Sequence, residues 1–364
     1  MNSTEAELWP NLYIELRSRG LTTIVFESTL IILINISALV GNFFTCWVIY
    51  KDERLHTITY GYIGALAMSD LLYACLVNPL IDASLVTGEW NLGKTACQVQ
   101  AVLCIAFAWN SLHLMTLISV NRYFRVIRSE VYRRRFSWKL TAFLIGASLF
   151  CAVFSSSFPY FPGWCEYVFQ PGKAVCFMHI YDRYSSENRF FTLIMTVVYV
   201  IIPIIVISFC YARVFRVVKV QQKNLIRNLN RIHITSTLDN TRNVTTNEHA
   251  SSITEGSVGS NTNACALAQL CRNPEEIRLN RVLLVLVLGC AICWLPVIII
   301  EIIDTLIGSL PRAAHVLYTY LGSLSGAVNP LVYGIMNRKF RKEMLRLLRM
   351  CRPNKRTIVG PYGN

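Results

Sequence analysis

The chain has 364 residues, of which 54% are hydrophobic and 15% charged, and its mean hydropathy is +0.42. This apolar content exceeds the roughly 45–50% of soluble domains, which excludes an ordinary soluble domain and indicates a protein that crosses the membrane repeatedly. The formal net charge of +14 comes mainly from Lys and Arg residues on one side of the predicted membrane spans. This distribution indicates membrane topology, so nucleic-acid binding is not expected.

Seven segments are long and apolar enough to cross a bilayer, since a spanning helix needs about 20 mostly apolar residues. They cover residues 24–50, 58–84, 96–127, 139–161, 190–218, 279–307 and 313–335. We therefore predict an all-α membrane protein whose seven-helix bundle forms one domain over residues 24–335. Of the 35 Lys and Arg residues, 28 lie on one side of these spans. Positive loops face the cytoplasm, so residues 1–23 are expected outside the cell.

Polar segments flank and interrupt this domain. Asn2 begins an Asn-Ser-Thr acceptor pattern for glycosylation on the expected outer side. Residues 221–275 are rich in Asn, Ser and Thr and lack periodicity, which predicts a disordered cytoplasmic loop. Residues 336–364 begin with a short amphipathic eighth helix, expected at the membrane surface. Cys351 follows that helix and is a candidate palmitoylation site, and the basic run 133–135 is expected to contact anionic membrane lipid.

Polar side chains inside the spans point to function, because a charge at the centre of a span costs about 2.5–3.5 kcal/mol. Asp70 lies about 18 Å into the second span, near the midplane. Four polar residues of other spans reach the same depth: Asn42, Ser111, Ser325 and Asn329. Carboxylate, amide and hydroxyl oxygens at one level predict a site for water or a small cation, and a purely structural polar network fits the same pattern.

Cysteines on the expected outer side can form a disulfide bond, because the exterior is oxidising. Cys97 precedes the third span, and Cys176 lies in the loop after the fourth. We favour a bridge between Cys97 and Cys176, which would pin this loop over the bundle. Cys165 lies in the same loop and is a competing partner that the sequence alone does not exclude.

An arginine, Arg122, ends the third span and follows the neutral Asn121. Glu276 precedes Trp294 by five helical turns, or about 27 Å, which brings it to the same cytoplasmic end. Pro296 removes a backbone hydrogen bond from the sixth span and forms a natural hinge. We expect a charge pair between Arg122 and Glu276 to hold the third and sixth spans together until this hinge opens.

Several motifs together resemble the rhodopsin-like (class A) G-protein-coupled receptors along nearly the whole chain. In chain order they are Gly41-Asn42, Leu66-Ala67-Met68-Ser69-Asp70, Trp90 with Cys97, Asn121-Arg122-Tyr123, Pro203 with Tyr211, Cys293-Trp294-Leu295-Pro296, and Asn329-Pro330-Leu331-Val332-Tyr333. The resemblance implies a plasma-membrane receptor rather than an enzyme. Its expected partners are a heterotrimeric G protein, arrestin and receptor kinases.

The resemblance also implies roles for individual residues. In that family the arginine matching Arg122 holds the inactive state and then turns toward the G protein, while the tyrosines matching Tyr211 and Tyr333 swing inward. The implied activation switch comprises Asn121, Arg122, Tyr123, Tyr211, Glu276, Trp294, Pro296, Asn329, Pro330 and Tyr333. The implied sodium site, with no other cofactor expected, comprises Asn42, Asp70, Ser111, Ser325 and Asn329.

Three positions depart from the family pattern. They are Asn121 in place of an acid, Leu149 or Phe150 in place of a tryptophan, and Cys290 in place of a phenylalanine. Among subfamilies the chain is most similar to melatonin receptors and their invertebrate relatives, which suggests an inhibitory G protein. Its ligand positions differ from theirs, with Tyr160, Met178 and Tyr199 in place of asparagine, phenylalanine and histidine. The ligand is therefore left open between a melatonin-like molecule, a lipid and a peptide.

The expected ligand pocket is a largely apolar cup. Cys104 replaces the aspartate of amine receptors and Ser323 the lysine of opsins. The expected pocket residues are Cys104, Ile105, Ala108, Met195, Tyr199, Trp294, Val297, Ile298, Glu301, His315, Thr319 and Ser323. At the mouth, Glu301 and Asp304 either attract a cationic ligand or form a solvated rim.

A second hypothesis is an ion-coupled transporter or channel that uses the Asp70 site. Transporters usually carry internal repeats and interrupted spans in matching positions, and neither is visible in this sequence.

Overall fold

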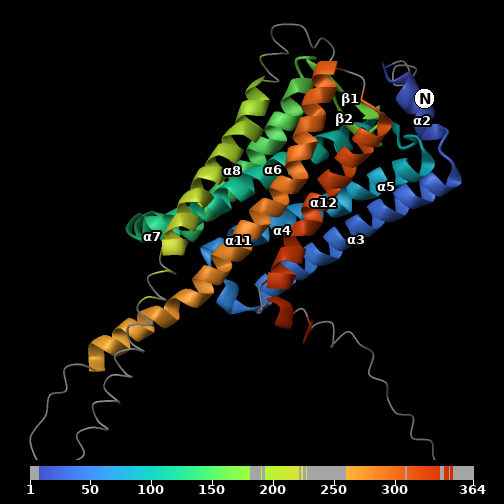
Figure 1. Cartoon of the computed structure of the whole chain (residues 1–364). Helices are drawn as coiled ribbons and strands as arrows, with labels where there is room; N and C mark the ends of the chain where they lie inside the picture. The colour runs from blue at the N-terminus through green and yellow to red at the C-terminus, as the bar shows by residue number, and fades with distance from the viewer. Residues whose placement is uncertain are drawn as a thin grey trace, which may run out of the picture.

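A computed structural model describes residues 8–180, 193–220, 260–307 and 310–336, with a few positions around 190–227 and 340–346. Of residues 260–277 and 305–307 it describes the backbone only. Long helices lie side by side in one bundle (Figure 1). Of the predicted disordered loop 221–275, residues 260–275 are helical and begin α11, which differs from the expectation, and the remainder lies largely outside the described residues, as does the amphipathic segment after residue 336.

Residues 8–157 contribute seven α-helices and one short 3₁₀ turn. They are α2 (Pro10–Arg17), α3 (Leu21–Lys51), η1 (Glu53–Leu55), α4 (Ile58–Leu76), α5 (Asn78–Thr87), α6 (Gly93–Ile127), α7 (Ser129–Arg135) and α8 (Trp138–Ser157). The second predicted span is thus two helices, α4 and α5, because Pro79 cannot continue the backbone hydrogen bonding of α4.

The described part of residues 158–336 adds a second 3₁₀ turn, a hairpin and the remaining long helices. They are η2 (Phe158–Tyr160), β1 (Cys165–Gln170), β2 (Val175–Ile180), the helix Leu193–Val220 with a π-helical turn at Val197–Ile201, α11 (Ser260–Ile307) and α12 (Arg312–Met336). The two strands pair antiparallel, with Phe169 opposite Cys176.

Six helical stretches among the described residues are long and apolar enough to cross a membrane. They are Leu21–Lys51, Ile58–Thr87, Gly93–Ile127, Trp138–Tyr160, Leu193–Val220 and Arg278–Asp304. The helix α12 packs against α3 and α11 and completes the bundle. It carries buried polar residues such as Ser323 and Asn329, which lower its hydropathy. The protein is a multi-pass membrane protein.

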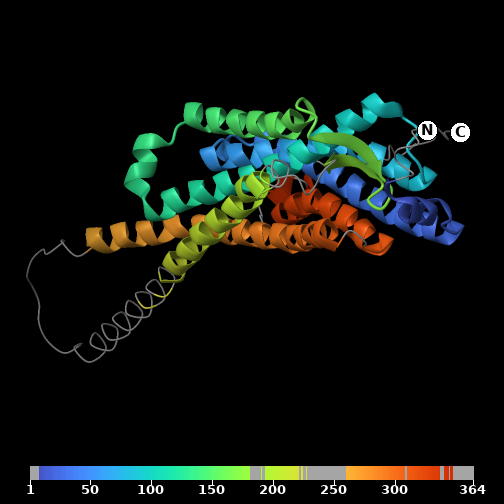
Figure 2. The same cartoon turned by 90° about the horizontal axis from the view of Figure 1, so that it is seen from above.

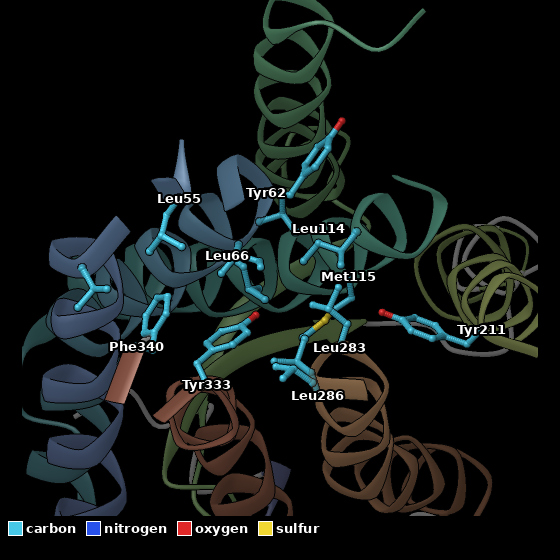
Figure 3. Close-up of a cluster of buried hydrophobic side chains, with 14 residues drawn as sticks. Leu55, Tyr62, Leu66, Leu114, Met115, Tyr211, Leu283, Leu286, Tyr333 and Phe340 are labelled. Atoms are coloured by element: carbon cyan, nitrogen blue, oxygen red, sulfur yellow. The ribbon is translucent and has the colours of Figure 1, made fainter. Parts of the chain in front are cut away.

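Figure 3 shows the largest cluster of buried apolar side chains among the described residues. Most of its members lie on α4, α6 and α11, and α3, η1, helix 193–220 and α12 add Val48, Leu55, Tyr211 and Tyr333. Arg122 lies near the C-terminal end of α6, and we call this end of the bundle the arginine end. The hairpin and α2 lie together at the opposite end, which we call the hairpin end (Figures 1 and 2).

Two glycines let α12 approach its neighbours closely. A Cβ atom at Gly41 would lie 2.6 Å from Pro330 Cγ, and a Cβ atom at Gly289 would lie 2.6 Å from Val328 Cγ1. Small residues at such crossings allow membrane helices to pack backbone to backbone. They position the polar residues of α12 against those of α3 and α4.

We predict that Gly41→Ala destabilises the bundle, because the added methyl group overlaps the ring of Pro330. Overpacking of this kind costs about 1–3 kcal/mol. The measurement is the melting temperature of the purified protein in detergent. Gly146→Ala is the control, since a Cβ atom there would meet nothing within 4 Å. Equal melting temperatures for the two variants would contradict the close approach of α3 and α12.

Candidate functional site

A buried carboxylate lies between α4, α6 and α12. Asp70 is 8% exposed. Its carboxylate accepts hydrogen bonds from the Asn329 amide at 2.7 Å and the Ser111 hydroxyl at 3.3 Å. Asn42 donates instead to the carbonyl oxygens of Ala38 and Gly326, and the Ser325 hydroxyl bonds within its own helix, to Gly322. Three of the five predicted sodium-site residues thus meet directly.

A second polar network joins α4, α6 and α8. The Asn110 amide donates to Ser69 at 3.0 Å, and the Ser148 hydroxyl donates to Asn110 at 2.8 Å. Leu149 and Phe150, near the missing tryptophan, are exposed on the outside of α8. Ser148 therefore provides the polar link between α8 and α6.

At the arginine end, Asn121 is fully buried and hydrogen bonded to other helices. Its carbonyl oxygen accepts from the Thr59 hydroxyl of α4 at 2.9 Å, and its amide donates to the Tyr132 hydroxyl of α7 at 3.4 Å. Arg122, the next residue, is 1% exposed. Tyr123 is partly buried, and its ring lies 5.8 Å from that of Phe209. Asn121 therefore ties α6 to α4 and α7.

Two tyrosines face the apolar core from opposite sides. The hydroxyl groups of Tyr211, on helix 193–220, and Tyr333, on α12, point toward the core, with Met115 and Leu283 between them in this view (Figure 3). Both hydroxyl groups are buried. That of Tyr333 lacks a hydrogen-bond partner among the described residues, whereas that of Tyr211 interacts with the Ser119 hydroxyl. The positive charge of Arg122 lies near both side chains. These two tyrosines and the arginine share one buried compartment.

The predicted hinge lies on a continuous helix, since α11 runs unbroken through Trp294 and Pro296. Pro330 lies inside α12, against Gly41. The side chain of Glu276, the expected partner of Arg122, lies outside the described residues.

At the hairpin end, the expected pocket residues fall into groups. Tyr199 stacks on Trp109 with ring centroids 4.2 Å apart and donates to the Cys151 carbonyl oxygen at 3.0 Å, so it packs between α6 and α8. Glu301, His315 and Thr319 meet the turn of the hairpin, residues 171–174. Of the others, Ile105, Val297 and Ser323 are buried, and Cys104, Ala108, Met195, Trp294 and Ile298 are partly buried.

The hairpin is the part of this end that the sequence analysis did not foresee. The Lys173 ammonium lies 2.7 Å from the Glu301 carboxylate, and the Thr319 hydroxyl donates to the Lys173 carbonyl oxygen at 2.7 Å. The signal was present in the sequence, because two aromatic and β-branched runs flank Pro171-Gly172. That pattern predicts a hairpin, but it does not predict where the turn of the hairpin lies relative to the helices.

A second missed cluster ties the N-terminal segment to the bundle. Glu27 on α3 accepts hydrogen bonds from Arg312 on α12 and from Arg19. Arg19 also donates to the Leu85 carbonyl oxygen of α5. Leu16 of α2 is buried beneath the hairpin. The segment before the first span therefore packs on the hairpin end.

The disulfide bond joins Cys97 to Cys176, with Cα atoms 5.3 Å apart. Cys165 stands opposite Ile180 in the hairpin register, far along the strands from Cys176, and remains a free thiol. Burial raises the pKa of the Cys165 thiol to about 11. Asn2 and Cys351, the expected modification sites, lie outside the described residues.

The family is decided by a comparison of the whole sequence with known families. Residues 41–333 match the model of the 7 transmembrane receptor (rhodopsin family). The chain belongs to this family. The resemblance inferred from the motifs is thereby confirmed, and membership favours a receptor over an enzyme, a transporter or a channel.

Individual relatives are distant. The G-protein coupled receptor moody of Drosophila pseudoobscura pseudoobscura is 24% identical over 93% of this chain, which spans 54% of that protein's length. Melatonin receptor type 1B-B of Danio rerio is 21% identical over 91% of the chain and 84% of the relative. The crystal structure of squid rhodopsin has a TM-score of 0.72 at 20% identity and covers 93% of this chain and 89% of its own. The rhodopsin match supports the seven-helix fold.

We predict that peptide mapping without reduction finds Cys97 linked to Cys176 and Cys165 as a free thiol. Because the raised pKa keeps Cys165 protonated, about one thiol in a thousand is ionised at pH 8. Alkylation of Cys165 in the folded receptor should therefore be slow at pH 8 and accelerate as the pH rises toward 11. Rapid labelling at pH 8, or a peptide linking Cys165 to Cys176, would contradict this assignment.

Proposed function

We propose that this receptor carries an extracellular signal across the plasma membrane and activates a heterotrimeric G protein at the arginine end. The observation that carries the proposal is the buried compartment shared by Arg122, Tyr211 and Tyr333. A buried charge, and a buried hydroxyl group such as that of Tyr333 with no partner among the described residues, are costly to keep in an apolar bundle. Their retention is explained if they change partners in a second, active arrangement.

In this proposal the hairpin end faces outward and the tail inward. The orientation is supported by the excess of Lys and Arg on the loops and tail at the arginine end. The similarity to melatonin receptors supports an inhibitory G protein as the transducer, with arrestin and receptor kinases as regulators.

Arg122 is restrained, in this proposal, by another helix rather than by its neighbour. The neutral Asn121 makes its hydrogen bonds to Thr59 and Tyr132, which supports a role in fixing α6 rather than in pairing with the arginine. We propose Glu276 of α11 as the restraining acid. Movement of α11 about Pro296 would separate the two charges and release Arg122 toward the G protein.

A sodium ion beside Asp70 is the second part of this proposal. The carboxylate is buried, the Ser111 hydroxyl adjoins it, and the Asn329 carbonyl oxygen has no hydrogen-bond partner within the described ranges. A buried carboxylate beside neutral oxygen atoms suits a small hard cation. The ion would offset the charge of Asp70 and hold α4, α6 and α12 in the resting arrangement.

We predict that Glu276→Ala raises basal G-protein activation, because the charge that restrains Arg122 is lost, and that Arg122→Ala lowers activation below that of the native receptor. The measurement is dissociation of G-protein subunits in cells at equal surface expression. Glu275→Ala removes the neighbouring carboxylate and serves as the matched control.

Unchanged basal activity in Glu276→Ala would contradict the proposed ion pair between Glu276 and Arg122. The receptor function itself is tested by the native chain with a panel of melatonin, lysolipids and peptides. Membrane current or solute uptake, without basal or ligand-induced dissociation of any G-protein class, would contradict it.

We predict that sodium stabilises the resting receptor through Asp70. Replacing choline by sodium at constant ionic strength should raise the melting temperature and lower basal G-protein activation, because the ion binds one state preferentially. Asp70→Asn should abolish both effects. Asp82→Asn, which changes a half-buried carboxylate bonded to Asn35 on another part of the bundle, should retain them. A sodium effect that survives Asp70→Asn would contradict the site.

A further inference from the structure

The turn of the hairpin is buried inside the helix bundle. All four turn residues, 171–174, are buried, whereas connecting turns normally lie on the surface. Ala174 packs against Ile31 and Leu85, and Val175 packs against Val77 and Phe107. The turn therefore descends among α3, α5, α6 and α12, into the mouth of the expected ligand pocket.

Lys173 is held by groups that would recognise any ammonium ion. Its side chain is 2% exposed, and lysine is almost never so buried unless it is paired. The ammonium group contacts the Glu301 carboxylate at 2.7 Å and lies over the rings of Tyr318 and Phe177, 4.4 and 4.9 Å from their centroids. A carboxylate with aromatic faces is a cation site, because the negative charge and the ring quadrupoles both attract the ammonium.

The main chain of the turn is fixed as closely as the side chain. The Thr319 hydroxyl of α12 donates to the Lys173 carbonyl oxygen. Gly172 lies against His315, since a Cβ atom at this glycine would be 2.8 Å from the imidazole ring. The turn therefore bridges α11, through Glu301, and α12, through His315 and Thr319.

We propose that Glu301, Tyr318 and Phe177 form an ammonium-recognition site that the receptor fills with its own Lys173 when no ligand is bound. A ligand with a primary ammonium or guanidinium group takes this site by displacing the lysine. Two of the three recognising groups, Glu301 and Tyr318, lie on α11 and α12. Replacement of the lysine by a ligand therefore changes the contacts of the two helices that carry Pro296 and Asn329. Glu301 is 42% exposed on its side chain and is accessible to an incoming cation.

The inference narrows the ligand class of the receptor proposed above, and it is tested without any signalling assay. Lys173→Ala removes the lysine side chain beyond Cβ, and propylammonium replaces the missing atoms. We expect Lys173→Ala to lower the melting temperature of the purified receptor by several degrees. Propylammonium should restore it in a saturable manner, and propan-1-ol, which matches its length without the charge, should not.

The double variant Lys173→Ala with Glu301→Gln is the matched control. It retains the vacated space and loses the carboxylate, so propylammonium should no longer raise its melting temperature.

Where Lys173→Ala alone yields too little folded protein, the surface yield of cells grown with propylammonium or propan-1-ol replaces the melting temperature. Recovery with propylammonium alone supports the site. Equal effects of the amine and the alcohol, no effect of either, or rescue that persists with Glu301→Gln would overturn it. If propylammonium rescues the variant as expected while no G protein responds to the receptor, the ammonium site is supported and the proposed function is contradicted.

Discussion

A polar side chain on a membrane-spanning helix must find its partner inside the bundle, because lipid offers none. The hydrogen bond from Asn329 to Asp70 is the central case, since it joins α12 to α4 around a buried carboxylate. Asn110 joins α6 to α4 and α8 in the same way. Because each of these side chains would be costly to expose to lipid, the polar pairs fix the rotation of every helix that takes part. The close crossing at Gly41 and Pro330 then sets the distance between helices.

The same constraint explains the arginine end. Asn121 cannot neutralise Arg122, and its carbonyl and amide groups are used by α4 and α7. Asn121 therefore joins α6 to α4 and α7 directly beside the arginine. The buried tyrosines 211 and 333 lie across the apolar core from one another (Figure 3). An inward movement of either helix would bring the two hydroxyl groups closer together.

At the hairpin end the bundle uses one of its own lysines to satisfy a carboxylate. The disulfide bond to Cys97 attaches the hairpin to α6, and the buried turn carries Lys173 to Glu301. The apolar cup expected from the sequence is therefore not an open cavity at its mouth, because the turn fills the space beside His315 and Thr319. The alternative interpretation, in which Glu301 belongs to a solvated rim, applies only to the exposed part of its side chain.

The sequence by itself determined the family and the approximate positions of the spans, because the cost of polar groups in lipid acts on each segment separately and the motif spacing is local. It also brought Ser111 and Asn329 to the level of Asp70. It left open whether Cys97 or Cys165 pairs with Cys176, and it did not foresee Lys173 as the partner of Glu301. Those choices belong to the tertiary structure, since they depend on which side chains from distant segments meet in space. A hairpin pattern predicts a turn, and only packing against the helices decides that the turn points inward.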